Sequence, residues 1–121
     1  MVAVGVLDAP DDAPARAQLD LARRAYDLGA TAATGADDAW LAGFVDWWQG
    51  PGAWASLAPD TQRAFRTVGW KLSQEVASLL DDGTDSAGYG AIAAPTLLLG
   101  GAQSPMAERR VLQRLAASLP H

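Results

Sequence analysis

The sequence predicts a mainly α-helical fold with one or two short parallel strands. Alanine, the best helix former, occupies 26 of the 121 positions. Over several long stretches, apolar residues recur at three- and four-residue steps, a spacing typical of amphipathic helices. Residues 95–101 instead form a mostly apolar run bounded by Pro and Gly, and this pattern favours a strand buried on both faces.

Four long helices are expected, at residues 13–28, 36–49, 59–80 and 105–118. Asp12 is expected to cap the first helix and Ser104 the last, because short polar side chains accept from the free N–H groups of a first turn. Two further acids, at 37 and 38, stand where the helix dipole favours negative charge. Shorter turns are expected at 53–57 and 87–91, and a loop at 30–35.

The apolar residues of these helices fall into stripes that predict the buried faces. The first helix carries Ala15, Leu19, Ala22 and Tyr26, and the last carries Val111, Leu112 and Leu115 opposite a polar face that holds Arg109, Arg110, Gln113 and Arg114. The longest stripe, in the third helix, consists of Phe65, Val68, Leu72, Val76, Leu79 and Leu80.

The predicted strand at 95–101 lacks an obvious neighbour. A fully buried parallel strand needs a partner for its backbone N–H and C=O groups. Within this chain, residues 2–6 are the only candidate. A sheet of two strands is marginally stable, so the expected strands need more sheet than the sequence provides.

Composition excludes several classes of function. The formal net charge of −5 argues against capture of nucleic acid or of an anionic membrane by clustered Lys and Arg. The chain has no Cys, and its single His is His121, so thiolate chemistry and a histidine-based triad are not expected. No apolar stretch reaches the roughly 18–20 residues of a membrane span, and no signal peptide is evident, which predicts a cytoplasmic protein.

Residues 44–54 carry a motif with a resemblance. They read F-V-D-W-W-Q-G-P-G-A-W and resemble the F-V-D-Y-W-N-G-x-G-A-W stretch in the cap region of a group of bacterial α/β-hydrolase-fold proteins. The differences are Trp47 for Tyr and Gln49 for Asn. In that group a long helix, a P-T-L-L-L-x-G strand, a G-x-x-S-P turn and a helix follow, an order matched here over about residues 36–120.

The resemblance implies a partial α/β-hydrolase fold. Residues 1–91 would form a helical, lid-like cap, and residues 92–121 would form one strand-helix unit of the core. In that family the P-T-L-L-L strand lies inside a mostly parallel sheet of about eight strands. The chain would then begin after the first half of the sheet and end just before the next core strand.

The family's activity is hydrolysis of ester or related bonds by a Ser-His-acid triad, and the expected catalytic residues are missing. No G-x-S-x-G nucleophile elbow occurs, and the nearest candidate, Ser86, lacks the first Gly and a preceding strand. Ser104 stands where the acid is often found, and His121 lies too early for the base. The resemblance therefore implies a chain that is inactive alone, with no catalytic residue.

Three tryptophans are the remaining candidates for a site. Trp47, Trp48 and Trp54 would line an apolar pocket under a lid, or else pack the helices together. Asp46, between aromatic residues, is expected to cap a turn or pair with an Arg. The acidic pairs at 11–12, 37–38 and 81–82 fit helix ends better than metal ligands, so no metal or cofactor is expected.

Two non-enzymatic functions stay open. The chain could be a helical interaction module whose exposed apolar residues, Leu97, Leu98 and Leu99 together with the tryptophans, are covered by a second copy or by a partner chain. It could also bind a small apolar ligand in the Trp-lined pocket.

Overall fold

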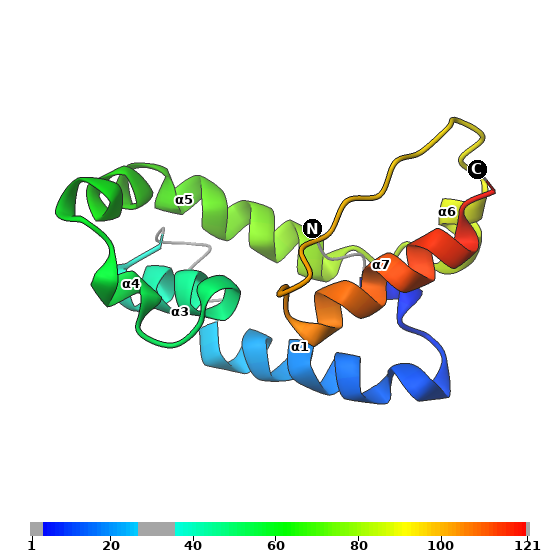
Figure 1. The fold of residues 1–121 in the computed structure, drawn as a ribbon, viewed down its shortest axis with the longest axis horizontal. Helices are drawn as coiled ribbons and strands as arrows, with labels where there is room; N and C mark the ends of the chain where they lie inside the picture. The colour runs from blue at the N-terminus through cyan, green and yellow to red at the C-terminus, as the bar shows by residue number, and fades with distance from the viewer. Residues whose placement is uncertain (1–3, 27–35, 121) are drawn as a thin grey trace. The chain divides into compact units, whose positions relative to one another are not determined.

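The structure, a computed structural model, describes residues 4–26 and 36–120, and Figure 1 shows its helices. The chain groups into two compact units. Met1–Asp20 with Leu79–His121 is called the terminal unit below, and Leu21–Ser78 the central unit. The division expected from the resemblance, at residues 91 and 92, stays a prediction.

The elements follow one another as helices and short turns. The 3-10 helices are η1 (Val4–Val6) and η2 (Pro10–Asp12). The α-helices are α1 (Ala13–Tyr26), α3 (Asp38–Gln49), α4 (Ala53–Ser56), α5 (Pro59–Asp81), α6 (Ser86–Gly90) and α7 (Met106–Ser118). All four long helices predicted from the sequence are present, whereas the loop expected at 30–35 lies outside the described residues.

The predicted parallel strands are wrong, and with them the strand-helix core of a partial α/β-hydrolase fold. Residues 4–6 form the 3-10 helix η1, and residues 95–101 have no regular secondary structure. Over the described parts of the chain no strand forms. The physical reason is the missing ladder, because an apolar run without a pairing partner cannot satisfy a strand's hydrogen bonds.

The core of the terminal unit joins α1 and α7 to the first turns of the chain. It consists of Val6, Leu7, Ala15, Leu19, Ala107, Val111 and Leu115, with Tyr89 and Leu98 packed against it. The predicted stripes of α1 and α7 are thereby confirmed at Ala15 and Leu19 and at Val111 and Leu115. Gly5 passes so close to the Thr84 carbonyl that a Cβ at this position would lie 2.3 Å from its oxygen.

The central unit packs α3 and α4 against α5. Its core is Trp40, Leu41, Val45 and Trp54, surrounded by partly buried residues that include Phe65, Leu72 and Val76. Asp37 caps α3 by accepting from the Trp40 N–H at 2.8 Å, as an acid at this end should. Val68 of the predicted α5 stripe is instead 44% exposed, and the buried positions beside it are Gly69 and Ser73.

The helices bear on two further expectations. The N-cap of α7 is Pro105, and the first-turn N–H of Ala107 donates to the Gln18 side chain at 2.7 Å, so the expected capping role of Ser104 is wrong. No helix in the described ranges has the length and apolar character needed to cross a membrane.

Candidate functional site

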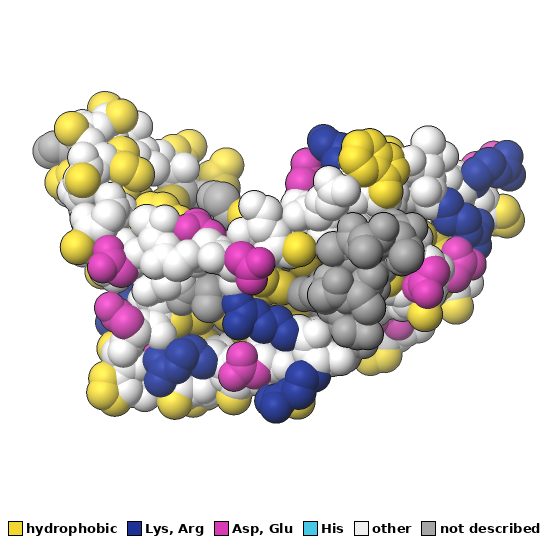
Figure 2. Space-filling view, turned by 180° about the vertical axis from the view of Figure 1, so that it is seen from behind, with side chains coloured by type: hydrophobic (Ala, Val, Ile, Leu, Met, Phe, Trp, Pro, Cys, Tyr) yellow, Lys and Arg dark blue, Asp and Glu magenta, His cyan; other side chains and the backbone are white. Residues whose placement is uncertain are grey.

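The most unusual feature of the terminal unit is residues 91–105, called the arm here. Figure 1 shows it as a long drawn-out trace that leaves α6 and returns to the start of α7. Most of its residues are exposed, and Figure 2 shows hydrophobic side chains on this projection, at the upper left of the view. Exposed apolar side chains gathered on one segment are typical of an interaction surface.

The three consecutive leucines of the arm alternate between solvent and core, while the other residues from 91 to 103 are all exposed. Leu97 is 81% exposed and Leu99 is 80% exposed. Leu98, between them, is half-buried and packs against the core of the terminal unit. This alternation has the period of a β-strand, although the arm is not part of a sheet.

The middle of the arm has an unpaired backbone, whereas its ends make local bonds, from the Ile92 N–H to the Tyr89 carbonyl and from the Ser104 N–H to the Gly101 carbonyl. Among the described residues, no backbone hydrogen bond joins residues 95–100 to another segment. The one side-chain bond in this stretch is local, from Thr96 Oγ1 to the Ala94 carbonyl oxygen at 3.0 Å. The N–H and C=O groups beside Leu97 and Leu99 therefore have no hydrogen-bond partner among the described residues, and they are available to water or to another polypeptide.

Both ends of the arm are fixed to its own unit. At one end α6 packs against α7, and a Cβ on Gly90 would lie 3.3 Å from the Ser118 carbonyl oxygen. At the other end a Cβ on Gly100 would lie 2.1 Å from Leu112 Cδ1, so the backbone passes directly over α7. The middle of the arm contacts the core through Leu98.

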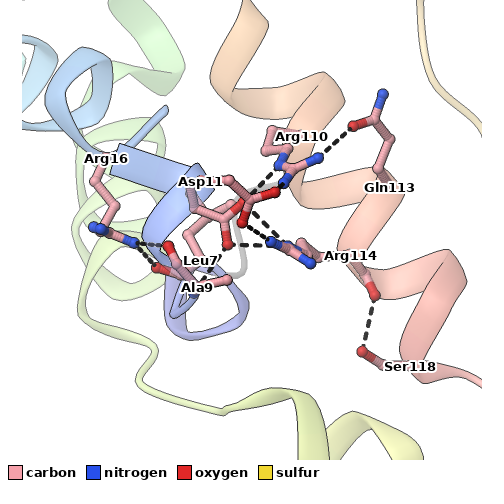
Figure 3. Close-up of polar contacts among 9 residues, drawn as sticks. Leu7, Ala9, Asp11, Arg16, Arg110, Gln113, Arg114 and Ser118 are labelled. Atoms are coloured by element: carbon pink, nitrogen blue, oxygen red, sulfur yellow. Dashed lines mark hydrogen bonds and ion pairs between the residues drawn. The ribbon is translucent and has the colours of Figure 1, made fainter. Parts of the chain in front are cut away.

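A cluster of charges attaches α7 to the first turns of the chain (Figure 3). Asp12 is fully buried, and its carboxylate accepts from Arg110 Nε at 2.5 Å and from Arg114 Nε at 2.9 Å. It also accepts from the Ala9 N–H at 3.1 Å. Asp11, at the surface, accepts from both guanidinium groups. We call these four side chains the Asp–Arg clamp.

The clamp corrects one sequence-based expectation and adds to another. Asp12 was expected to cap α1, but it binds two arginines about a hundred residues further along the chain. Arg110 and Arg114, which the sequence places on the polar face of the last helix, have side chains that are only 26% and 27% exposed. Burial alone raises the pKa of Asp12, but hydrogen bonds from Arg114 and Arg110 outweigh it and leave that pKa below 3.8.

Two polar features lie on the remaining faces of α7. Glu108 is 5% exposed, its Oε1 has no hydrogen-bond partner in the described structure, and burial raises its pKa to about 7. On the other face, an open pocket of about 250 Å³ is lined by Met106, Arg109, Arg110 and Gln113. Of these, Arg109 makes one long contact, 3.5 Å from Nη1 to the Ala102 carbonyl oxygen.

In the central unit, the aromatic motif forms a closed turn between α3 and α4. Asp46 accepts from the Gly52 N–H at 2.9 Å and from the Trp54 N–H at 2.8 Å, and these bonds hold its pKa below the usual value. Gly50 and Gly52 have φ of 100° and 82°, a region that disfavours other residues. The expected capping role of Asp46 is confirmed, and the motif's Asp and two Gly thus have a structural reason.

The three candidate tryptophans have different surroundings. Trp54 is 8% exposed and packs edge-on against Phe65, with 6.0 Å between the ring centres. Trp47 is half-buried, and Trp48 is 37% exposed. Their role in lining a substrate pocket stays a prediction.

The two serines considered for a triad lie in separate segments of the terminal unit. Ser86 is the first residue of α6, directly after its N-cap Asp85. Ser104 lies in the turn before α7, where its N–H donates to the Gly101 carbonyl. His121 lies outside the described residues.

Comparisons with known proteins add no relative. No protein-family model, no curated protein and no solved structure matches the chain. The resemblance to α/β hydrolases stays a prediction that depends on the residues of the motif alone.

Proposed function

We propose that this chain is a non-catalytic interaction module that docks through its arm onto an extended strand of another polypeptide. The observation that carries the proposal is the arm's apolar middle, where Leu97 and Leu99 are about four-fifths exposed beside an unpaired backbone. Addition of a strand to an exposed sheet edge is a recurrent mode of protein recognition, and the arm, although not in a sheet, offers the same kind of unpaired backbone groups.

The chemistry of the arm fits this mode. Backbone hydrogen bonds would provide sequence-independent pairing, and the two outward leucines would contact side chains of the incoming strand. Because the arm is already held at both ends, pairing orders fewer residues than docking of a free peptide would. The helices of the terminal unit then serve as the support that presents the arm.

A strand-forming peptide tests this proposal. The probe is an acetylated, fluorescently labelled peptide of alternating Thr and Val, and its binding is followed by fluorescence anisotropy. We expect saturable binding that is lost when alternate amides of the peptide are N-methylated, because methylation removes the donors of the ladder. Equal binding of both peptides, or no binding, would contradict backbone pairing.

Proline substitutions give a matched pair within the chain. Leu97→Pro removes an N–H from the middle of the proposed pairing stretch, whereas Ala93→Pro makes the same change outside it. We expect the first variant to lose the peptide and the second to keep it. The reverse result would place the docking site elsewhere.

The resemblance of residues 44–54 supports a second, narrower proposal. We infer that the chain is related to α/β hydrolases in sequence but does not hydrolyse esters alone, since the sequence has no G-x-S-x-G nucleophile elbow and its single His, His121, lies too early for the family's base. A nitrophenyl ester assay tests this inference. Turnover that a serine-directed inhibitor abolishes would refute it.

A further inference from the structure

Resting on the proposed function, we propose that the strand which pairs with the arm is the arm of a second copy of this chain. The two arms would run antiparallel across a two-fold axis that passes beside Leu98. A contact of this kind is isologous, so one surface patch must complement itself. The sequence of the arm and the charges at its two ends both satisfy that requirement.

The register of an antiparallel pair makes the leucines of the arm complementary to themselves. In an antiparallel pair centred on Leu98, residue 97 of one copy lies directly opposite residue 99 of the other. Leu97 therefore meets the second copy's Leu99 twice in each dimer, on the face that is exposed in the single chain. Leu98 keeps its contact with its own core, so docking needs no rearrangement of the unit.

The charges at the two ends of the arm are complementary only when the two arms run antiparallel. Asp81, Asp82 and Asp85 precede the arm, and Arg109 follows it. Arg109 touches the arm itself, at the Ala102 carbonyl, through a contact of 3.5 Å. An antiparallel arrangement brings the acidic end of each arm to the basic end of the other, and a parallel one would place like charges together.

The net charge of −5 opposes association of two copies, but it acts mostly at long range. At physiological salt, charges separated by more than about 8 Å are largely screened, so the net charge then opposes docking less. The oligomeric state is therefore to be measured at that ionic strength.

Light scattering coupled to size-exclusion chromatography tests the pairing, from about 10 μM to about 1 mM chain. The wild-type chain is expected to shift from monomer to dimer mass over this range. Leu97→Glu and Leu99→Lys should each weaken the dimer about tenfold or more, because the two-fold axis makes every substitution count twice. Both positions are about 80% exposed, so the helices should fold unchanged, as circular dichroism would verify.

The double variant L97E/L99K identifies the register. In the antiparallel pair, each Glu at 97 faces a Lys at 99, so the double variant should recover the dimer that each single substitution weakens. Leu21→Glu is the matched control, because it places the same charge on a leucine that is 63% exposed outside the arm. This control should behave as wild type.

The possible results separate cleanly. A wild-type chain that is monomeric throughout the range, or a dimer that both single variants leave intact, would overturn pairing of two copies. Single variants that are monomeric with a double variant that stays monomeric would overturn the antiparallel register. Binding of the Thr-Val peptide by a monomeric wild-type chain would leave the proposed function standing while this inference fails.

Discussion

Removal of the buried carboxylate of the Asp–Arg clamp, by Asp12→Ala, is expected to destabilise the terminal unit strongly. The carboxylate accepts from Arg110, from Arg114 and from the Ala9 N–H, and it is fully buried. Its loss leaves an N–H and two guanidinium groups without their shared acceptor. Asp11→Ala is the matched control, since Asp11 binds the same two arginines but is 68% exposed.

The burial of the two acids sets the expected difference. Loss of one partner from a buried ion pair costs about 3–5 kcal/mol, and exposed pairs contribute about 0–1 kcal/mol. Because both arginines are about a quarter exposed, water can solvate part of their freed charge. We therefore expect about 3 kcal/mol for Asp12→Ala and less than about 1 kcal/mol for Asp11→Ala.

Urea denaturation followed by far-ultraviolet circular dichroism is the suitable assay. All five tryptophans lie within the central unit, so their fluorescence would report on the wrong part of the chain. Equal losses of unfolding free energy in the two variants would refute the reasoning, because it depends on the burial of Asp12 and not on the number of ion pairs.

The pH dependence of the unfolding free energy, compared between wild type and Asp12→Ala, provides a second test. The pKa of Asp12 in the folded chain is below the ordinary 3.8, so its ionised form stabilises the fold at pH values above about 3.8. That contribution disappears as the pH falls through the lower, folded-state pKa. The gap in unfolding free energy between wild type and Asp12→Ala should thus be constant near neutral pH and narrow in acid.

Three further predictions test other contacts. Asp46→Ala should lower the unfolding midpoint seen by Trp fluorescence, since two N–H groups of the turn after α3 lose their acceptor; an unchanged midpoint would contradict this role. Gly5→Ala should cost more than about 1 kcal/mol because its Cβ would clash with the Thr84 carbonyl, whereas Gly83→Ala, in open space, should be neutral or slightly stabilising. Burial raises the pKa of Glu108 to about 7 from 4.5, so its ionisation opposes folding increasingly between those values. Glu108→Gln should therefore add on the order of 2 kcal/mol to the unfolding free energy near pH 8 and little near pH 4, and equal effects at both would count against the buried carboxylate.

Local patterns predicted the helices well because their causes are local. Ala15 and Leu19 are buried as their spacing indicates, and Asp37 caps α3 because a side-chain oxygen there reaches the N–H three residues on. The capping role of Asp46 in the turn of the aromatic motif was predictable for the same reason. Asp46 and the two glycines with positive φ lie within seven residues of one another.

Contacts between distant residues were not predictable in this way. The partners of Asp12 lie 98 and 102 residues away, so nothing near it distinguishes a buried ion-pair partner from a helix cap. The prediction of a strand at residues 95–101 was wrong for a related reason. Its composition suits a strand, but a strand is defined by a neighbour, and hydrophobic patterning alone does not provide one.

The clamp and the arm depend on one another through α7. Arg110 and Arg114 attach this helix to the start of the chain, and Leu112, on another face, supports the arm at Gly100. A loosened α7 would leave the arm with a less fixed end, and pairing would then have to order more of the chain. Asp12→Ala should therefore weaken dimer formation under conditions where circular dichroism still shows a folded chain, although the substitution lies outside the paired surface. A dimer of unchanged strength in that variant would show that the arm keeps its conformation without the clamp.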